Sequence, residues 1–154
     1  MVAWGDGWLR RRVTLTPEAQ HVLDALERAG VPFGIVTNGL ARKRHTLRVL
    51  GLERRAAVVI ISDDLGRRKP DVAVFTRAAT DLGVRPEVAL FVGDKARQDI
   101  RGARDAGMKT AWLRRGRAHW SARGARPDVI LGSLGDLPAA IGLSPGRAPA
   151  SAAS

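Results

Sequence analysis

The sequence predicts an α/β fold in which helices cover both faces of a mostly parallel sheet. Apolar runs of three to five residues alternate along the chain with segments of helical periodicity, and the runs are too short to be helices. Most of the runs are apolar throughout, which is typical of a strand buried on both faces. Together these observations predict a three-layer, Rossmann-like arrangement.

The expected elements follow one another with few interruptions. Thr16 is a candidate N-cap and Pro17 suits the first helical position, so the first helix is expected to run to Gly30. A basic loop is expected over residues 114–127 and a polar loop over residues 62–70. The other expected strands are residues 32–36, 57–61, 88–92, 110–113 and 129–131, and the other expected helices are residues 40–51, 71–82, 95–106 and 134–141.

The stretch from Val88 to Gly107 predicts strand, turn and helix, with two carboxylates near one crevice. Asp94 follows the expected strand directly, and Asp99 lies about one turn into the expected helix. Two carboxylates suit a hard divalent cation such as magnesium, which takes oxygen ligands. A structural interpretation stays open, because Asp94 could cap the helix and Asp99 could pair with Lys95.

Polar residues also follow the ends of the other expected strands. Thr37 and Asn38 come after one strand, and Lys69 lies on the loop after the next. Because parallel strands end at one edge of a sheet, we expect these side chains to gather near Asp94. A hydroxyl, an amide, an ammonium and a carboxylate are the groups that a metal-bound phosphate requires.

Length, composition and charge exclude several classes of protein. The 154 residues suit one domain over residues 1–143, with an irregular segment at 1–12 and a disordered tail at 144–154. There is no cysteine for a disulfide or thiolate site, the three histidines are scattered, and no apolar run could span a membrane, so a cytoplasmic location is expected. The net charge of +11 leaves nucleic-acid binding as an alternative, although the arginines form scattered clusters and no single stripe.

Several motifs in register resemble the haloacid dehalogenase (HAD) superfamily of hydrolases, over about residues 13–143. Several motifs in this order are far more specific than any one of them. The motifs are Val36-Thr37-Asn38-Gly39, Ser62 through Gly66 to Lys69-Pro70-Asp71, Val92-Gly93-Asp94 with Asp99, and Ala106-Gly107-Met108.

The resemblance implies a role for each matching residue. Thr37, flanked by Asn38, is similar to the residue that holds the substrate phosphate, and Lys69 to the lysine that neutralises the nucleophile and the transferring group. Asp94 is similar to the magnesium ligand, with Asp99 in or next to that shell. The implied activity is magnesium-dependent hydrolysis of small phosphorylated metabolites.

The chain departs from the family at the nucleophile. The family opens with a strand ending in Asp-x-Asp-x-Thr, and the sequence contains no such motif. Only Asp6 could serve. If it takes the second Asp position, Trp4 replaces the nucleophile and Trp8 the threonine, and if it takes the first, Trp8 replaces the general acid. We therefore expect a core that lacks the central first strand and the cap, has little or no activity alone, and exposes a sheet edge to a second copy. A non-catalytic domain that binds phosphate and magnesium is the alternative.

Overall fold

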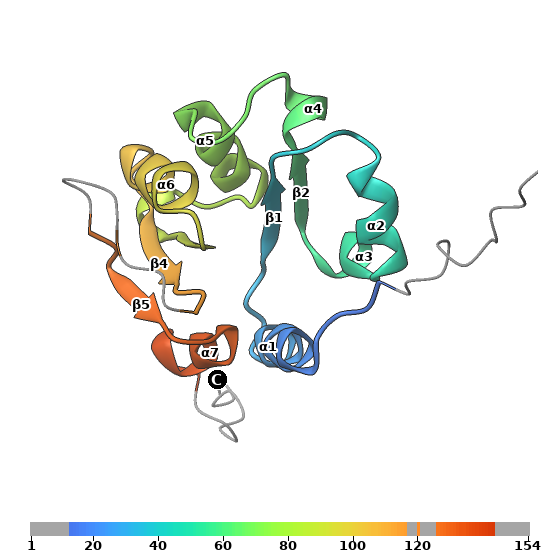
Figure 1. Cartoon of the computed structure of the whole chain (residues 1–154), viewed down its shortest axis with the longest axis vertical. Helices are drawn as coiled ribbons and strands as arrows, with labels where there is room; N and C mark the ends of the chain where they lie inside the picture. Colours follow the sequence, from blue (N-terminus) through green and yellow to red (C-terminus); the bar gives the residue numbers. More distant parts are fainter. Residues whose placement is uncertain (1–12, 117–119, 121–125, 144–154) are drawn as a thin grey trace, which may run out of the picture.

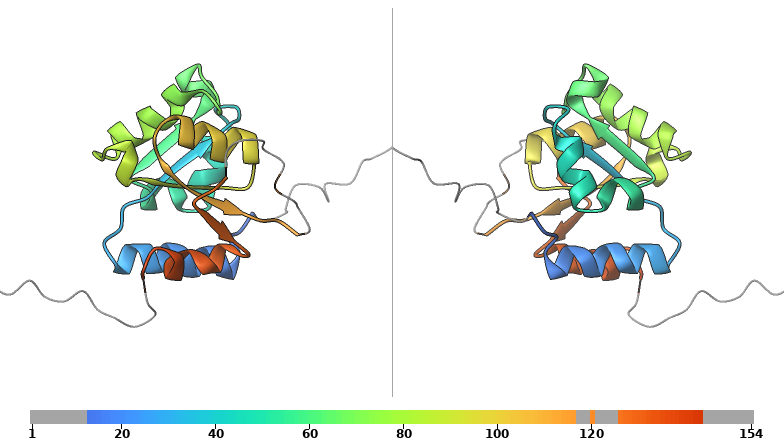
Figure 2. Two further views of the ribbon diagram at one scale, coloured as in Figure 1. Left: turned by 90° about the vertical axis from the view of Figure 1, so that its left-hand side faces the viewer. Right: turned by 90° about the vertical axis from the view of Figure 1, so that its right-hand side faces the viewer.

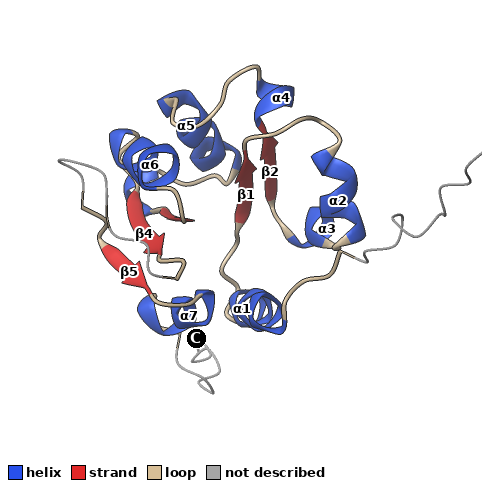
Figure 3. Cartoon of the chain, in the orientation of Figure 1, coloured by secondary structure: helices blue, strands red, loops and turns tan. Residues whose placement is uncertain are grey.

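A computed structural model describes residues 13–116, 120 and 126–143. Asp6, with the expected irregular segment 1–12, and the expected tail 144–154 lie outside these residues, as does most of the basic loop. The described chain forms short parallel strands surrounded by helices (Figures 1 and 3). The predicted α/β class with helices on both sides is confirmed.

Helices and strands alternate as expected. The first half contains α1 (Pro17–Arg28), β1 (Gly34–Thr37), α2 (Lys43–Val49), α3 (Leu52–Arg55), β2 (Val58–Ile61), α4 (Ser62–Leu65) and α5 (Val72–Asp81). The second half contains a 3₁₀ turn (Pro86–Val88), β3 (Leu90–Gly93), a π-helical turn (Ala96–Arg101), α6 (Gly102–Asp105), β4 (Lys109–Leu113), β5 (Val129–Leu131), a second 3₁₀ turn (Leu134–Asp136) and α7 (Leu137–Ala140).

The first helix has the ends that its sequence predicts. The Thr16 hydroxyl accepts a hydrogen bond from the Ala19 amide at 3.1 Å, and Pro17 occupies the first turn, where its missing N–H costs nothing. Val22 and Leu26 are the buried residues of the apolar stripe. A local cap and a period of 3.6 residues were sufficient to place this element.

Two segments contain a helical turn that the sequence did not predict. The apolar run from Val88 was predicted to be strand throughout, but Pro86 starts a 3₁₀ turn, the Ala89 amide donates to the Pro86 carbonyl, and the strand begins only at Leu90. The predicted polar loop 62–70 begins with the short helix α4.

Two predicted helices are divided, and a third begins later than expected. The helix expected over residues 95–106 is a π-helical turn followed by α6, and the helix expected over 134–141 is a 3₁₀ turn followed by α7. The helix expected over 40–51 starts at Lys43, and Gly51, at φ 72°, separates it from α3. Periodicity locates these segments, but it does not distinguish α, 3₁₀ and π hydrogen bonding.

The strands form two parallel sheets in the described part of the chain. β1 pairs with β2, with Gly34 opposite Val58 and Thr37 opposite Ile61, while β4 lies between β3 and β5. β1 and β3 are not paired with each other, and none of the described residues forms a strand between them. The resemblance predicts that the whole chain lacks this central strand, and because residues 1–12 lie outside the described part, that absence stays a prediction.

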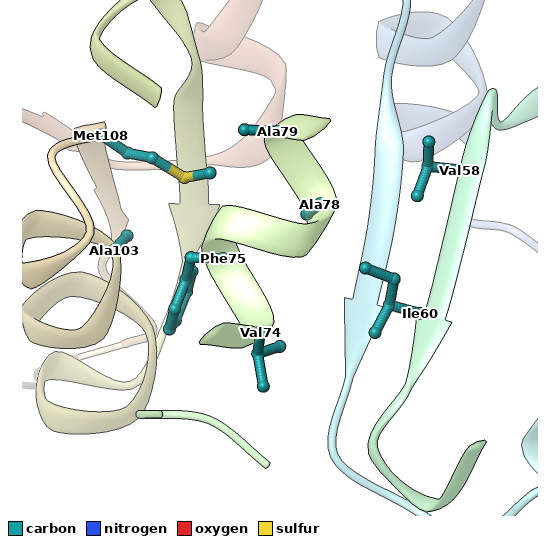
Figure 4. Packing of buried hydrophobic residues seen from close by; sticks show 8 residues of the cluster. All are labelled: Val58, Ile60, Val74, Phe75, Ala78, Ala79, Ala103 and Met108. Carbon is teal, nitrogen blue, oxygen red and sulfur yellow. The ribbon is translucent and has the colours of Figure 1, made fainter. Parts of the chain in front are cut away.

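Two apolar clusters hold the two sheets together. The first packs α5 and α6 against β2, and Val36 of β1 and Phe91 of β3 both pack against it. Figure 4 shows α5 between α6 and the β1–β2 pair. The second packs α1 and α7 against β4 and β5, and it also includes Phe33 and Val92. Figure 2 shows α1 and α7 side by side along one face. Helix packing on both faces therefore joins sheets that share no backbone hydrogen bonds.

Candidate functional site

The carboxyl ends of β1 and β2 bring Asn38 and Lys69 together. The Asn38 side chain donates to the Lys69 carbonyl at 3.0 Å, and the Lys69 amide donates to Asn38 Oδ1 at 2.9 Å. This reciprocal pair fixes the loop that carries Lys69 against the loop after β1. The Asn38 amide is thus engaged with the backbone, while its predicted contact with phosphate stays a prediction.

The Lys69 ammonium lies between the two sheets. Nζ donates to the Val36 carbonyl of β1 at 3.0 Å and lies 2.7 Å from Oδ1 of Asp99, which follows β3. It also lies 5.2 Å from the centre of the Phe91 ring. The side chains of Lys69 and Asp99 are only 11% and 6% exposed, so the pair is held away from water.

The turn after β3 folds the Asp99 side chain back over the strand. Oδ2 accepts a hydrogen bond from the Lys95 amide at 3.0 Å, whereas Oδ1 has the ion pair with Lys69 but no hydrogen bond of good geometry among the described residues. A β-carbon on Gly93 would lie 2.4 Å from the β-carbon of Asp99. Glycine is therefore required at position 93 for this close approach.

Asp94 is oriented by a different set of contacts. Its carbonyl accepts a hydrogen bond from the Trp112 indole at 3.0 Å, and its Oδ2 lies 2.7 Å from Nε of Arg115. The carboxylate is 34% exposed. Neither structural alternative for the two acids is seen: Asp94 does not cap the helical turn, and Asp99 is bound by the amide of Lys95 instead of its ammonium.

Thr37 lies at the end of β1, half-buried, with its hydroxyl 3.1 Å from Nζ of Lys43. The following loop is held by two residues of α4. The Ser62 hydroxyl accepts from the Gly39 amide at 3.0 Å and donates to its carbonyl, and the Asp63 carboxylate accepts from the Ala41 amide at 3.0 Å. The loop that carries Thr37 is therefore braced.

Sequence reasoning missed three contributors to this region: Lys43, Ser62 as a loop brace, and Arg115. Arg115 belongs to one of the scattered arginine clusters, and Lys43 was assigned no role. Lys43 lies six residues after Thr37, near the start of a helix, and that proximity was the one available signal.

The side chains of this region include possible ligands for a magnesium ion. Hard carboxylate oxygens are present, and magnesium in proteins uses one or two carboxylates with waters and substrate phosphate. No group of three or more metal-binding side chains gathers among the described residues. Asp94 fits this mode because its carboxylate is partly exposed at a strand end. Asp99 carries an oxygen without a hydrogen bond, but that oxygen faces Lys69.

The sequence matches a family model described as haloacid dehalogenase-like hydrolase over residues 4–107. The chain belongs to this family. The matched segment contains Thr37, Lys69, Asp94 and Asp99, so the predicted membership of the HAD superfamily is confirmed.

Sequence relatives of this HAD domain include several phosphatases. It is 38% identical to a phosphoserine phosphatase of Thermus thermophilus, over 83% of this chain and 51% of the relative. It is 43% identical to a glyceraldehyde 3-phosphate phosphatase of Methanopyrus kandleri, over 66% and 44%. With a phosphoglycolate phosphatase of Escherichia coli it shares 36% identity, over 84% and 52%. The chain spans about half the length of the curated relatives that it matches.

Solved structures show the same fold. A HAD phosphatase from Thermococcus onnurineus superposes with a TM-score of 0.76 at 32% identity, over 83% of this chain and 58% of the other. A 2-haloacid dehalogenase from Pseudomonas syringae gives 0.73 at 35% identity, over 82% and 53%. None of the helices in the described part of the HAD domain is long and apolar enough to cross a membrane.

Proposed function

We propose that this HAD domain binds the phosphate group of small phosphorylated metabolites and contributes to magnesium-dependent hydrolysis of their ester bond. The observation that carries the proposal is the position of the Lys69 ammonium beside Thr37 at the strand ends. The ammonium is held by the Val36 carbonyl and the Asp99 carboxylate, and the Lys69 backbone is held by the Asn38 side chain. The phosphatase relatives support this reaction class. The dehalogenase neighbour shares the fold, and fold alone does not select the reaction.

Each residue has a role in the proposal. The Thr37 hydroxyl and nearby backbone N–H groups donate to the phosphate oxygens, and Lys69 neutralises charge that develops during transfer. Asn38 flanks the phosphate and holds Lys69 through its backbone. Asp94 is the proposed magnesium ligand, and a bound magnesium ion would polarise the phosphate and neutralise part of its charge. The contacts of Asp99 favour a role next to this shell, as the partner of Lys69.

Hydrolysis by this route needs two further carboxyl groups. A carboxylate must attack phosphorus to form an aspartyl-phosphate, and a carboxylic acid must protonate the leaving oxygen. Thr37, Lys69 and Asp94 supply neither, and the sequence contains no Asp-x-Asp-x-Thr segment. We therefore propose that the 154-residue chain alone turns over small phosphate esters slowly or not at all.

An activity assay tests the proposal in two stages. The unmodified chain is assayed with magnesium against p-nitrophenyl phosphate and a panel of small phosphate esters, with little turnover expected. A fusion that supplies an N-terminal strand with Asp-x-Asp-x-Thr is expected to gain magnesium-dependent activity, which Lys69→Ala removes. Failure of a folded fusion to hydrolyse any ester, although it binds phosphate and magnesium, would favour the non-catalytic alternative.

Asp6 provides the opposing outcome. Substantial hydrolysis by the unmodified chain that Asp6→Asn abolishes would show that Asp6 supplies the nucleophile or the acid. Asp24→Asn is the matched control, because Asp24 lies on α1, where its carboxylate pairs with Arg55.

A further inference from the structure

Lys43 reaches from the start of α2 back across the loop that follows β1. Its Nζ donates to the Thr37 hydroxyl at 3.1 Å and to the Asn38 carbonyl at 2.8 Å, although the residue as a whole is exposed. An exposed lysine is ordinarily free to extend into water, because ordering it costs side-chain entropy. Two hydrogen bonds hold this one beside Thr37.

Gly39 creates the space for this conformation. A β-carbon at position 39 would lie 2.4 Å from Cδ of Lys43, 2.5 Å from Cε and 2.9 Å from Nζ. The lysine side chain therefore lies directly on the glycine, along the surface of the braced loop. Any residue larger than glycine would displace the end of the lysine.

Thr37 thus lies between two ammonium groups of different electrostatic character. Lys69 binds the carbonyl before Thr37, and its charge is balanced by the buried Asp99 carboxylate. Lys43 binds the carbonyl after Thr37 and forms no ion pair with any of the described residues. Of these two ammonium groups, that of Lys43 is the one whose charge is not balanced by a carboxylate of the described residues.

The contact also prepares the Thr37 hydroxyl as a donor. A hydroxyl that accepts a hydrogen bond from an ammonium group is polarised, so its own O–H becomes a stronger donor. With Lys43 on its acceptor side, the Thr37 proton is directed away from Nζ, and it is donated to the Asn38 carbonyl at 3.4 Å, a long hydrogen bond that a phosphate oxygen would replace. An ammonium has three donors, and two of those of Lys43 are used within the loop, so one is left for a ligand.

We propose that Lys43 is a second phosphate contact, and that it makes this site selective for dianionic phosphate monoesters over monoanionic phosphates. The proposal rests on the proposed function at Thr37 and Lys69. Bonds to charged groups and uncompensated charge at short range both favour the ligand with the larger charge. Lys43 therefore contributes more to binding a dianion than a monoanion.

Binding measurements on the full chain test this inference. Inorganic phosphate at slightly alkaline pH serves as the dianion and dimethyl phosphate as the monoanion, both followed by calorimetric titration. Lys43→Met is expected to weaken phosphate binding about 10-fold and to affect dimethyl phosphate less, so that the selectivity falls. Lys43→Arg, which retains the charge, is expected to recover most of the loss. Lys109→Met, an exposed lysine at the start of β4, is the control and should behave as the parent.

Gly39→Ala provides a test that leaves the net charge unchanged. Gly39 has no left-handed φ, and the atoms that its new methyl group would meet belong to a flexible side chain, so the variant is expected to fold. It should displace Lys43 and reproduce the effect of Lys43→Met. In a Lys43→Met background the same change should cause no further loss of phosphate affinity.

The outcomes separate this inference from the proposed function. If Thr37→Val weakens phosphate binding while folded Lys43→Met and Gly39→Ala bind both anions as the parent does, Lys43 is not a phosphate contact. If the parent chain binds no phosphate, or Thr37→Val, Lys69→Met and Lys43→Met all bind it equally well, the proposed function itself is wrong. Loss of selectivity in Lys43→Met with recovery in Lys43→Arg supports the inference.

Discussion

Lys69 and Asp99 form a buried ion pair, with 2.7 Å between Nζ and Oδ1, that links the loop after β2 to the turn after β3. The same ammonium donates to the Val36 carbonyl of β1. One side chain therefore bridges two sheets that share no backbone hydrogen bonds in the described chain. The lysine proposed to act on phosphate is also a structural link.

Removing one member of this pair should destabilise the domain strongly. Lys69→Met leaves the Asp99 carboxylate buried without its counter-ion, and breaking a buried pair in this way typically costs about 3–5 kcal/mol. Urea unfolding of the variant would measure the change. Lys43→Met, at an exposed position, is expected to change the free energy of unfolding by less than about 0.5 kcal/mol.

A double-mutant cycle separates the pair from the effects of either residue alone. Lys69→Met combined with Asp99→Leu removes both charges, so the double variant should be more stable than Lys69→Met by itself. Additive destabilisation in the double variant would contradict a coupled pair.

The facing sides of β1 and β3 lead to a prediction about association. Neither strand has a second strand partner among the described residues, and unpaired strand edges favour pairing with another chain. We expect the full chain to self-associate with increasing concentration, which sedimentation velocity would detect. The fusion that supplies an N-terminal strand should shift the equilibrium toward monomer. A parent chain that stays monomeric at high concentration and unfolds cooperatively at high temperature would contradict this prediction.

The sequence was most informative where structure is set locally. Helix α1 follows from Thr16, Pro17 and an apolar period, and each of these signals lies within a few residues of its effect. The prediction of a strand from Val88 was wrong. Its apolar residues suggested a buried strand, but Val88 is 65% exposed in the turn that Pro86 begins. An apolar side chain does not show whether it is buried.

The site was only partly predictable for the same reason. The sequence indicates that Thr37, Asn38, Lys69 and Asp94 follow strand ends. Parallel pairing places the ends of β1 and β2 at one edge of the first sheet and those of β3, β4 and β5 at one edge of the second. The partners of each side chain depend on tertiary contacts, such as the Asn38 amide with the Lys69 backbone 31 residues away. The sequence likewise does not predict that the Asp99 side chain packs so closely on Gly93 that no β-carbon fits there.

Asp128 gives the stability of the fold a pH dependence. Its carboxylate accepts hydrogen bonds at 2.8 Å from the hydroxyl and from the amide of Thr110, which is fully buried. The Thr110 hydroxyl is the largest cause that holds the pKa of Asp128 below its usual value of 3.8. The pKa of Asp128 is lower in the folded state than in the unfolded state. The ionised carboxylate therefore contributes its full stabilisation of the fold above the pKa of the unfolded state, and this stabilisation is lost as pH falls through the pKa of the folded state.

Asp128→Ala should therefore destabilise the domain at neutral pH, by about 1–3 kcal/mol, since buried Thr110 loses a hydrogen-bond partner. Urea unfolding of parent and variant should show the difference shrinking as pH falls below about 4. Asp136→Ala, which removes a carboxylate from an exposed capping box, is a comparison at the same end of the chain. A difference that grows on acidification would contradict the assigned sign.

Arg115 and a metal ion would compete for the same carboxylate. Arg115 Nε lies 2.7 Å from Oδ2 of Asp94, and the arginine side chain is 73% exposed, so the pair can open at modest cost. If Asp94 is the magnesium ligand, Arg115→Gln should bind magnesium several-fold more tightly than the parent, and Asp94→Asn should bind it weakly or not at all. Calorimetric titration of each protein measures the magnesium affinity without any assay of activity. Arg97→Gln, a neighbouring exposed arginine, is the control for the change in net charge. Equal magnesium affinity in the parent, Arg115→Gln and Asp94→Asn would place the metal elsewhere.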